Sequence, residues 1–289
     1  MAVGDLIVAD WQMERGGLLI GDTTDYDIRQ ISGLASLPEV RPQDRPLLLR
    51  HGSVPGLDYL GVRSFSVDLE LIDETSSSLS TKLATLGAAF QSEAAESVIA
   101  FQVPGIAGGV KAQVSGRVRR RDVPVGLEFA YGMAQASFEV VCSDPRIYSQ
   151  VENTDNVGLA TSGGGLTFNA SPNFTFGATS TGGTLNISNA GNFDAPVSFR
   201  IDGPITNPII ESVTTGKTLS FTITLATGEF LVVDSSARTV LLAGTASRYY
   251  TLDVGSEWFD LEPDTNEISF RADAATAATL TATWRDAWS

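Results

Sequence analysis

The stretch AQASFEVVCSDPRIY, residues 134–148, decides how the chain divides. Up to Cys142 its apolar side chains recur at every second position, and polar ones such as Ser137 and Glu139 lie between them. A period of two is typical of a β-strand with one buried face. Asp144-Pro145 follows, and proline removes a ladder donor and disfavours helix in the residue before it. We therefore expect one β domain to end here, about halfway along the chain.

The same alternation marks the sequence before this strand. Residues 64–71 read SFSVDLEL, again with one apolar face. Apolar residues then recur at helical spacing after a serine run that supplies N-cap candidates, which predicts one helix of about three turns. The first half of the chain is thus predicted to be a strand-rich domain with one inserted helix. The helical positions are Leu79, Leu83, Leu86 and Phe90, and the other expected strands are residues 6–9, 98–103 and 110–118.

Periodicity is lost after residue 148. Asn, Ser, Thr and Gly gather from residue 149 to residue 165, a composition that predicts a linker. Beyond it, short alternating segments are separated by turn signals such as Asp202-Gly203-Pro204, which is typical of a β-sandwich or jelly roll. We expect a β domain at residues 1–148, a linker at 149–157 and a sandwich at 158–289.

Charge and hydropathy exclude several classes of protein. The formal net charge of −15 argues against a specific nucleic-acid binder, for which a basic surface is expected. The N-terminus carries Asp5 and Asp10 and has no sustained apolar stretch, so it does not resemble a signal peptide. No segment approaches the ~18 uninterrupted apolar residues of a membrane helix. We expect a protein made in the cytoplasm that does not insert into membranes.

The chain offers little catalytic equipment. Its one cysteine, Cys142, lies on the apolar face of a strand, as expected of a core residue and not of a reactive thiol. Its one histidine, His51, lies in the turn-like sequence HGSVPG, and a zinc site needs three or four ligands. Acids cluster at residues 22–27 and 257–267, where solvated loops, a calcium site and a glycosidase carboxylate pair remain open. We assign no catalytic, cofactor or metal residue and predict that the chain is not an enzyme.

Two groups of side chains are candidate binding residues. Arg117, Arg119 and Arg121 share one face of a strand if its alternation is regular. Their partners are DNA phosphate, carboxylates of a neighbouring subunit, or solvent alone. Trp258, Tyr249 and Tyr250 form the second group. Large aromatic residues belong to a core by default, but exposed ones are able to stack on sugar rings.

Three segments resemble the distal tail proteins of long-tailed bacteriophages. One is the strand that runs into Asp144-Pro145-Arg146 and an aromatic residue, with a second β domain after it. Another is RPLLLRHGSVPGLDYLGVRSFSVDLEL, residues 45–71, with a glycine-punctuated loop and a long alternating strand. The third is the end of the chain, WFDLEPDTNEISF at 258–270 and LTATWRDAW at 280–288. Family members usually have Pro-Gly before the asparagine, where this chain has Pro263-Asp264-Thr265-Asn266.

The resemblance implies a fold and a role. The N-terminal domain would be a split-barrel-like ring of six subunits that continues the tail tube, and the C-terminal domain a galectin-like sandwich that projects outward to organise the baseplate. The chain would then be a structural virion protein of the distal tail, with the tail tube, tape-measure and tail-tip hub proteins as partners. DNA would pass through the ring without specific binding, and the three arginines would be inter-subunit contacts. Two alternatives stay open, a host-surface glycan adhesin and, further off, a glycosidase.

Overall fold

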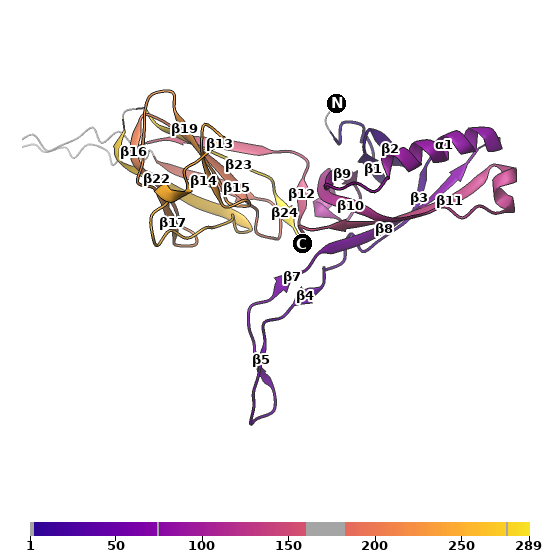
Figure 1. Ribbon diagram of the computed structural model, residues 1–289, viewed down its shortest axis with the longest axis horizontal. Helices are drawn as coiled ribbons and strands as arrows, with labels where there is room; N and C mark the ends of the chain where they lie inside the picture. Colours follow the sequence, from indigo (N-terminus) through magenta and orange to yellow (C-terminus); the bar gives the residue numbers. More distant parts are fainter. Residues whose placement is uncertain (1–2, 74, 160–182, 276) are drawn as a thin grey trace, which may run out of the picture. The chain divides into compact units, whose positions relative to one another are not determined.

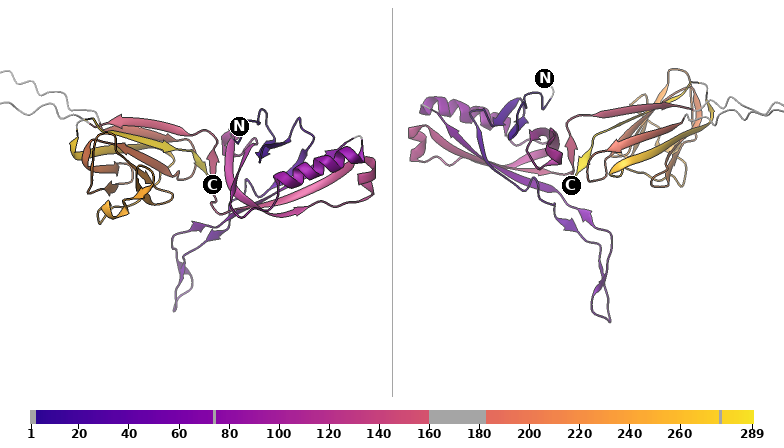
Figure 2. Two further views of the ribbon diagram at one scale, coloured as in Figure 1. Left: turned by 45° about the horizontal axis from the view of Figure 1, so that its top comes forward. Right: turned by 180° about the vertical axis from the view of Figure 1, so that it is seen from behind.

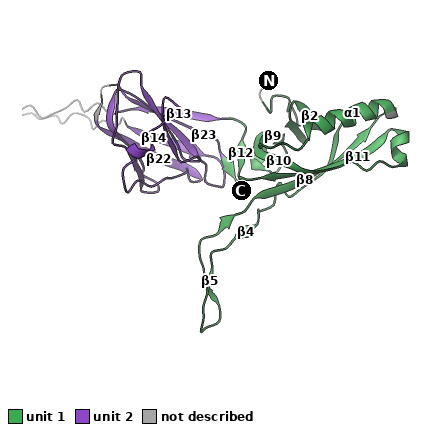
Figure 3. Cartoon of the chain, viewed as in Figure 1, with its two compact units in different colours: residues 1–151, 287–289 green, residues 152–286 purple. Residues whose placement is uncertain are grey.

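The computed structural model describes residues 3–73, 75–159, 183–275 and 277–289. The chain forms two compact units, the first made of residues 1–151 and 287–289 and the second of residues 152–286 (Figure 3). Both are built mainly from antiparallel strands, and α1 is the one α-helix of the described residues (Figure 1). The prediction of a mainly β chain with an inserted helix is confirmed.

The first unit is an antiparallel sheet with the order β2-β1-β9-β10-β11-β8-β3, extended by β12 beside β10 and by β24 beside β12. Gly21 N, at the end of the edge strand β2, donates to Tyr26 O just before the other edge strand β3, at 2.8 Å, but no ladder joins the two strands in the described part of the chain, so the sheet is not a closed barrel. The elements are β1 (Gln12–Arg15), β2 (Leu18–Gly21), β3 (Asp27–Ser32), β4 (Val40–Arg41), β5 (Arg45–Pro46), β6 (Ser53–Val54), β7 (Tyr59–Leu60), β8 (Arg63–Ile72), α1 (Ser76–Ala89), β9 (Ser97–Gln102), η1 (Ala107–Gly109), β10 (Ala112–Asp122), η2 (Leu127–Tyr131), β11 (Met133–Cys142), β12 (Ile147–Ser149) and β24 (Ala287–Trp288).

The predicted alternation places the core of this unit. β8 and β11 pair along their whole length, with Val67 opposite Phe138 and Leu69 opposite Ala136. Opposed residues of antiparallel strands share a face, so the apolar positions of both strands point the same way. These four side chains are buried, and Cys142 is buried among the same cluster, as its position predicted.

Helix α1 covers this apolar face. It begins after Thr75, whose hydroxyl accepts a hydrogen bond from Ser78 N at 3.3 Å, so the cap lies just before the serine run and not within it. At its other end Phe90 stacks on Phe138 of β11, with ring centroids 4.1 Å apart. The predicted helical positions therefore form the contact with the sheet. Leu79, Leu86 and Phe90 are buried, and Leu83 packs against the same cluster.

The strand expected at residues 6–9 is not formed. The backbone N–H groups of Val8 and Ala9 donate to the side-chain amide oxygen of Gln12, at 2.8 and 3.0 Å. Because these donors are satisfied by a side chain, the segment turns and the first strand begins only at Gln12. The apolar character of residues 6–9 was misleading, and the polar side chain that follows decides the local structure.

The second unit is a β-sandwich, as predicted. One sheet has the order β13-β23-β15-β19-β20-β21, the other β14-β22-β16-β17 with β18 beside β16. Along β14, β15 and β23 buried residues alternate with more exposed ones, so each sheet buries one face. Trp284 on β23 donates through Nε1 to Ser188 O on β14 at 3.0 Å and links the sheets. The elements are β13 (Asn153–Gly158), β14 (Thr184–Asn189), β15 (Val197–Asp202), β16 (Ile205–Ser212), β17 (Lys217–Ser220), β18 (Thr224–Leu225), β19 (Phe230–Asp234), β20 (Thr239–Leu242), β21 (Ala246–Ser247), η3 (Tyr249–Thr251), β22 (Asp264–Ala275) and β23 (Thr279–Trp284).

Residues 149–157 are not a linker without regular structure. Residues 153–158 form β13, which among the described strands pairs with β23 alone and is therefore an edge strand of the second unit. Four of its six residues are exposed and none is buried, so no position requires an apolar side chain, which explains why NTDNVG lacks alternation. The rest of the expected linker tract, from residue 160 to residue 165, lies outside the described residues.

The end of the chain also differs from the expected division at residue 158. Ala287 and Trp288 form β24, which pairs with β12 of the first unit. The Trp288 side chain packs against the hydrophobic core of that unit. The chain therefore passes between the units twice, at residues 151–152 and 286–287, so the first unit is discontinuous in sequence.

Candidate assembly surfaces

One face of the sheet in the first unit lies opposite the face that α1 covers, and it is polar. Three cross-strand pairs of β8 and β11 point to it: Ser66 with Glu139, Asp68 with Ser137, and Glu70 with Gln135. A hollow of about 480 Å³ crosses this face between β3, β8, β11 and β10. Glu70 forms an ion pair with Arg29 of β3. We call this surface the polar sheet face.

The three arginines of β10 do not share a face. A β-bulge inserts Arg119 as an extra residue opposite β11, which reverses the alternation on either side of it. Before the bulge, Arg117 Nη1 donates to Ala94 O at 3.4 Å; after it, Arg121 Nη1 donates to Gly87 O of α1 at 2.5 Å. The expectation of a shared face is therefore wrong, and Arg119 lies exposed at the bulge itself.

A long hairpin, residues 37–62, extends from the sheet; we call it the arm (Figures 1 and 2). It consists of two short ladders, β4 with β7 and β5 with β6. Strands this short bury almost nothing, and the arm accordingly holds many of the exposed apolar side chains of the protein. The exposed ones are Leu37, Leu47, Leu48, Leu49, Val54, Leu57, Tyr59 and Val62.

The base of the arm is fixed by the buried guanidinium of Arg63, the first residue of β8. Its Nη1 donates to Leu34 O at 2.5 Å and to Ser36 O at 2.9 Å, just before the arm begins. Its Nε donates to Pro145 O at 2.7 Å, in the stretch that ends the domain. Burial lowers the pKa of Arg63 from its ordinary value. The Arg63 side chain thus links the base of the arm to the Asp144-Pro145 segment.

The segment around Asp144 is a network in its own right. Asp144 accepts hydrogen bonds from Arg146 N at 3.0 Å and from the Tyr148 hydroxyl at 2.6 Å. Burial, and then the Asp144 carboxylate, raise the pKa of Tyr148 above its ordinary value. The DPR stretch is therefore held by its own side chains at the point where the first domain's continuous sequence ends.

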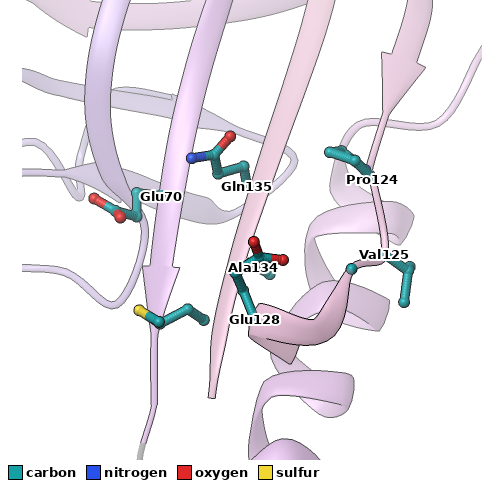
Figure 4. A pocket seen from close by; sticks show the side chains of 8 residues that line it. Glu70, Pro124, Val125, Glu128, Ala134 and Gln135 are labelled. Carbon is teal, nitrogen blue, oxygen red and sulfur yellow. The ribbon is translucent and has the colours of Figure 1, made fainter. Parts of the chain in front are cut away.

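A cavity of about 430 Å³ lies at the end of the sheet beside η2; we call it the η2 cavity (Figure 4). Glu70 and Gln135 line it from the neighbouring strands β8 and β11, while Val125 and Glu128 come from the segment that leads into and forms η2. Met133, at the start of β11, contributes a further apolar side chain. The cavity thus combines an apolar lining with two carboxylates, a combination that single-sequence periodicity did not reveal.

In the second unit, two of the three candidate aromatic residues come together. The rings of Tyr249 and Trp258 stack with centroids 6.4 Å apart and planes 19° apart. Tyr249 is 50% exposed and its neighbour Tyr250 is 79% exposed, while Trp258 is half-buried. The pair is therefore a surface feature and not part of the sandwich core.

The acidic residues and the single histidine gather no metal-ligand set. Within the described residues, no group of three or more His, Cys, Asp or Glu side chains is placed to hold a metal ion. His51 lies exposed at the tip of the arm. In the second acidic segment, Asp260 accepts a hydrogen bond from the Ser235 hydroxyl at 2.8 Å. Separately, none of the described helices has the length and hydropathy to cross a membrane.

A family model described as siphovirus-type tail component, C-terminal domain, matches residues 190–288. Those residues are similar to the C-terminal domain of siphovirus-type tail components. The predictions of a structural phage-tail protein and of a location in the tail are thereby confirmed. No curated protein matches the chain.

Solved structures extend the likeness in fold to nearly the whole chain. The crystal structure of the Dit protein of phage SPP1, described as a paradigm of hub adsorption apparatus in phages that infect Gram-positive bacteria, aligns with a TM-score of 0.65 at 16% identity. It covers 94% of this chain and 97% of that one. Two structures of the phage p2 baseplate in its activated conformation, with Ca and with Sr, align at 10% identity with TM-scores of 0.45 and 0.48. They cover 94% of this chain and 97% and 96% of theirs.

The turn before Asn266 explains where this chain departs from the usual Pro-Gly. Asp264 takes the position of that glycine and has a φ of 71°, in the left-handed region that glycine favours and aspartate tolerates. Asn266 is buried, and its side chain accepts from Glu262 N at 2.9 Å and donates to Glu262 O at 2.7 Å. The asparagine thus holds the turn together, and the backbone conformation is kept without the glycine.

Proposed function

We propose that this tail component forms a ring at the distal end of the tail, joining the tail tube to the tail tip or baseplate. The observation that carries the proposal is the fold shared with SPP1 Dit over 94% of the chain, together with the tail-component domain at residues 190–288. The first unit forms the ring, which has six copies, as in the family of distal tail proteins that the chain resembles. The tail tube, tape-measure and hub proteins are the partners.

The polar sheet face is the surface that we assign to the channel. It carries Asp68, Glu70 and Glu139 and little exposed apolar surface. Carboxylates that line a channel repel DNA phosphates and so discourage DNA from adhering during passage. Asp68→Asn with Glu139→Gln should therefore slow DNA ejection from assembled virions while particle yield stays normal. Unchanged ejection kinetics would remove this assignment without touching the position of the ring.

The position in the virion is tested by labelling. An antibody against the purified full chain should mark only the tail end distal to the capsid in electron micrographs of the phage that encodes it. Native mass spectrometry of the same chain should show a closed oligomer, with six subunits expected. Label along the whole tail, or at the capsid end, would contradict the proposal.

Arg119 is the arginine that we assign to a contact between subunits. It is exposed at the bulge, whereas Arg117 and Arg121 donate to backbone carbonyls of their own chain. Arg119→Glu should weaken the oligomer, and Arg238→Glu, on an exposed turn of the second unit, is the matched control. Equal oligomer stability in both variants would argue that Arg119 is only solvated.

A second function, binding of host-surface glycan, is favoured by the stacked rings of Tyr249 and Trp258 with Tyr250 exposed beside them. Aromatic faces of this kind stack on sugar rings. A glycan array probed with the full chain should give signals that Tyr250→Ala abolishes. Tyr131→Ala, an equally exposed tyrosine of the first unit, is the control that should leave them unchanged. An array without signal would leave the ring as the only role proposed.

A further inference from the structure

The arm and the η2 cavity carry complementary chemistry at opposite ends of the same unit. We propose that the arm tip of one copy of this chain binds in the η2 cavity of a second copy. The proposal deepens the ring by naming the segments that meet. It rests on the proposed function in only one respect, namely that copies of the chain come into contact.

The arm tip is a preformed structure that presents two leucines to solvent. β5 pairs with β6, and the loop beyond them is closed by a hydrogen bond from Leu47 N to Gly52 O at 3.1 Å. Between these residues Leu48 and Leu49 are 95% and 97% exposed. A tip that is already ordered loses little conformational entropy on binding. Exposed apolar side chains held on a projecting hairpin mark a surface for a partner.

The η2 cavity presents apolar side chains to solvent beside its polar ones. Val125 is 74% exposed and Met133 is 39% exposed, although both line the same cavity. The cavity volume of about 430 Å³ lies within the range of sites that enclose small ligands, so it has room for a few side chains. The leucine side chains of the arm tip are apolar, as are Val125 and Met133 in the lining, and are small enough for this volume.

The arm tip and the η2 cavity also carry opposite charges. Arg50 follows the two leucines directly, and Glu128 lines the cavity. Both are exposed, and neither forms an ion pair within the described part of the chain. An arginine and a carboxylate pair with directional, charge-assisted hydrogen bonds, which fixes the register of an apolar contact. The second carboxylate of the cavity, Glu70, adds to the negative potential but already pairs with Arg29.

We assign the occupant to a second copy because the arm does not reach the η2 cavity of its own chain. Two views show the arm leading away from the end of the sheet that holds η2 (Figures 1 and 2). No residue of the arm lines the η2 cavity. Tip and cavity are different patches, so the contact is heterologous, and heterologous contacts generate rings when the rotation closes. The contact therefore accounts for closure of a ring without requiring a self-complementary interface.

Disulfide trapping tests the contact directly. Leu48→Cys in one full-length chain and Val125→Cys in another should cross-link when mixed, at about ten times the yield of Leu48→Cys with Val110→Cys. Val110 is the matched control, since it is a half-exposed valine of the same unit outside the cavity. The natural Cys142 is buried and does not compete. Equal yields from the two mixtures would overturn the proposal.

A charge exchange tests the register. Arg50→Glu added to the Leu48→Cys chain, or Glu128→Arg added to the Val125→Cys chain, should each lower the cross-linking yield severalfold, and the two together should restore it. A generic apolar association shows no such restoration. Restoration that fails while both single exchanges lower the yield would contradict the Arg50–Glu128 pairing.

The outcomes separate this inference from the ring. A hexamer that survives Leu48→Asp with Leu49→Asp, without specific cross-linking, would leave the ring standing and remove the arm contact. Specific cross-linking from a chain that is monomeric by native mass spectrometry would do the reverse, because trapping captures transient encounters. Circular dichroism of each variant confirms that the sheet is intact, so loss of fold is not mistaken for loss of contact.

Discussion

In the second unit two sheets cover each other's apolar faces, whereas in the first a single sheet has α1 on one face and a polar surface on the other, with an arm of exposed leucines beside it. The apolar side chains of the sandwich stabilise the chain itself. Those of the arm gain nothing from folding and are retained at the expense of solubility. The first unit is therefore suited to contacts with other chains, whereas the second unit buries most of its apolar side chains within itself.

The largest expected effect on stability comes from replacing a buried aromatic ring of the first unit with a methyl group. Phe138→Ala removes the partner of Phe90 beneath α1 and should lower the free energy of unfolding by about 3–5 kcal/mol. Leu49→Ala, at the arm tip, should change it by less than about 0.5 kcal/mol. Denaturant unfolding of both variants measures the contrast. A large loss from Leu49→Ala would mean that the arm packs on its own chain.

The second largest effect on the free energy of unfolding is expected at Arg63, at the base of the arm. Arg63→Met leaves the carbonyl oxygens of Leu34, Ser36 and Pro145 without their donor, so the free energy of unfolding should fall by about 3 kcal/mol. Limited proteolysis should also cut the arm faster. Arg41→Met is the matched control, since its exposed guanidinium makes one hydrogen bond, to Leu60 O at 3.3 Å, and little change is expected. Equal proteolysis of the two variants would show that Arg63 does not hold the arm.

Sequence patterns predicted the parts of the molecule whose stability depends on one buried face. The alternation in β8 and β11 and the helical spacing in α1 located all three elements, because burial of one face dictates the period. Both misplaced segments depend on something else. Polar β13 is an edge strand, and the residues before β1 are held by Gln12.

Contacts between distant segments were beyond the sequence. The bulge at Arg119 adds one residue and leaves no signature in a run of arginines, so the predicted common face was wrong. The arm was visible only as a glycine-punctuated loop because its strands have two residues each, too few to show a period. The η2 cavity joins residues 70, 124–128 and 133–135, and only the fold brings them together.

The covered face of the first unit should also respond to alkaline pH. Burial raises the pKa of Cys142 from its ordinary value of 9.0 to about 12. Below pH 9 the thiol is protonated in both states, and the stability it contributes is complete. Between pH 9 and pH 12 the unfolded chain ionises first, so that contribution is progressively lost.

The Cys142→Ala variant is the reference for this measurement, because it has no thiol to titrate. Its stability deficit relative to the natural chain should shrink by about 2 kcal/mol between pH 8 and pH 10.5. Denaturant unfolding at the two pH values provides the measurement. A deficit that is constant with pH would mean that the thiol is reached by solvent, and fast reaction with a thiol reagent would show the same.

The smallest effect belongs to the second unit and tests whether its turns are locally optimal. At φ 71° Asp264 occupies a conformation that is less costly for glycine, and no hydrogen bond of its side chain is present among the described residues. Asp264→Gly should therefore raise the free energy of unfolding by about 0.5 kcal/mol, the relief of left-handed strain exceeding the added chain entropy. Thr265→Gly, next in the chain but not in a left-handed conformation, should lower it instead. If both substitutions lowered stability alike, the aspartate would have a role in this turn beyond tolerating its backbone, and Asn266 would not suffice to hold it.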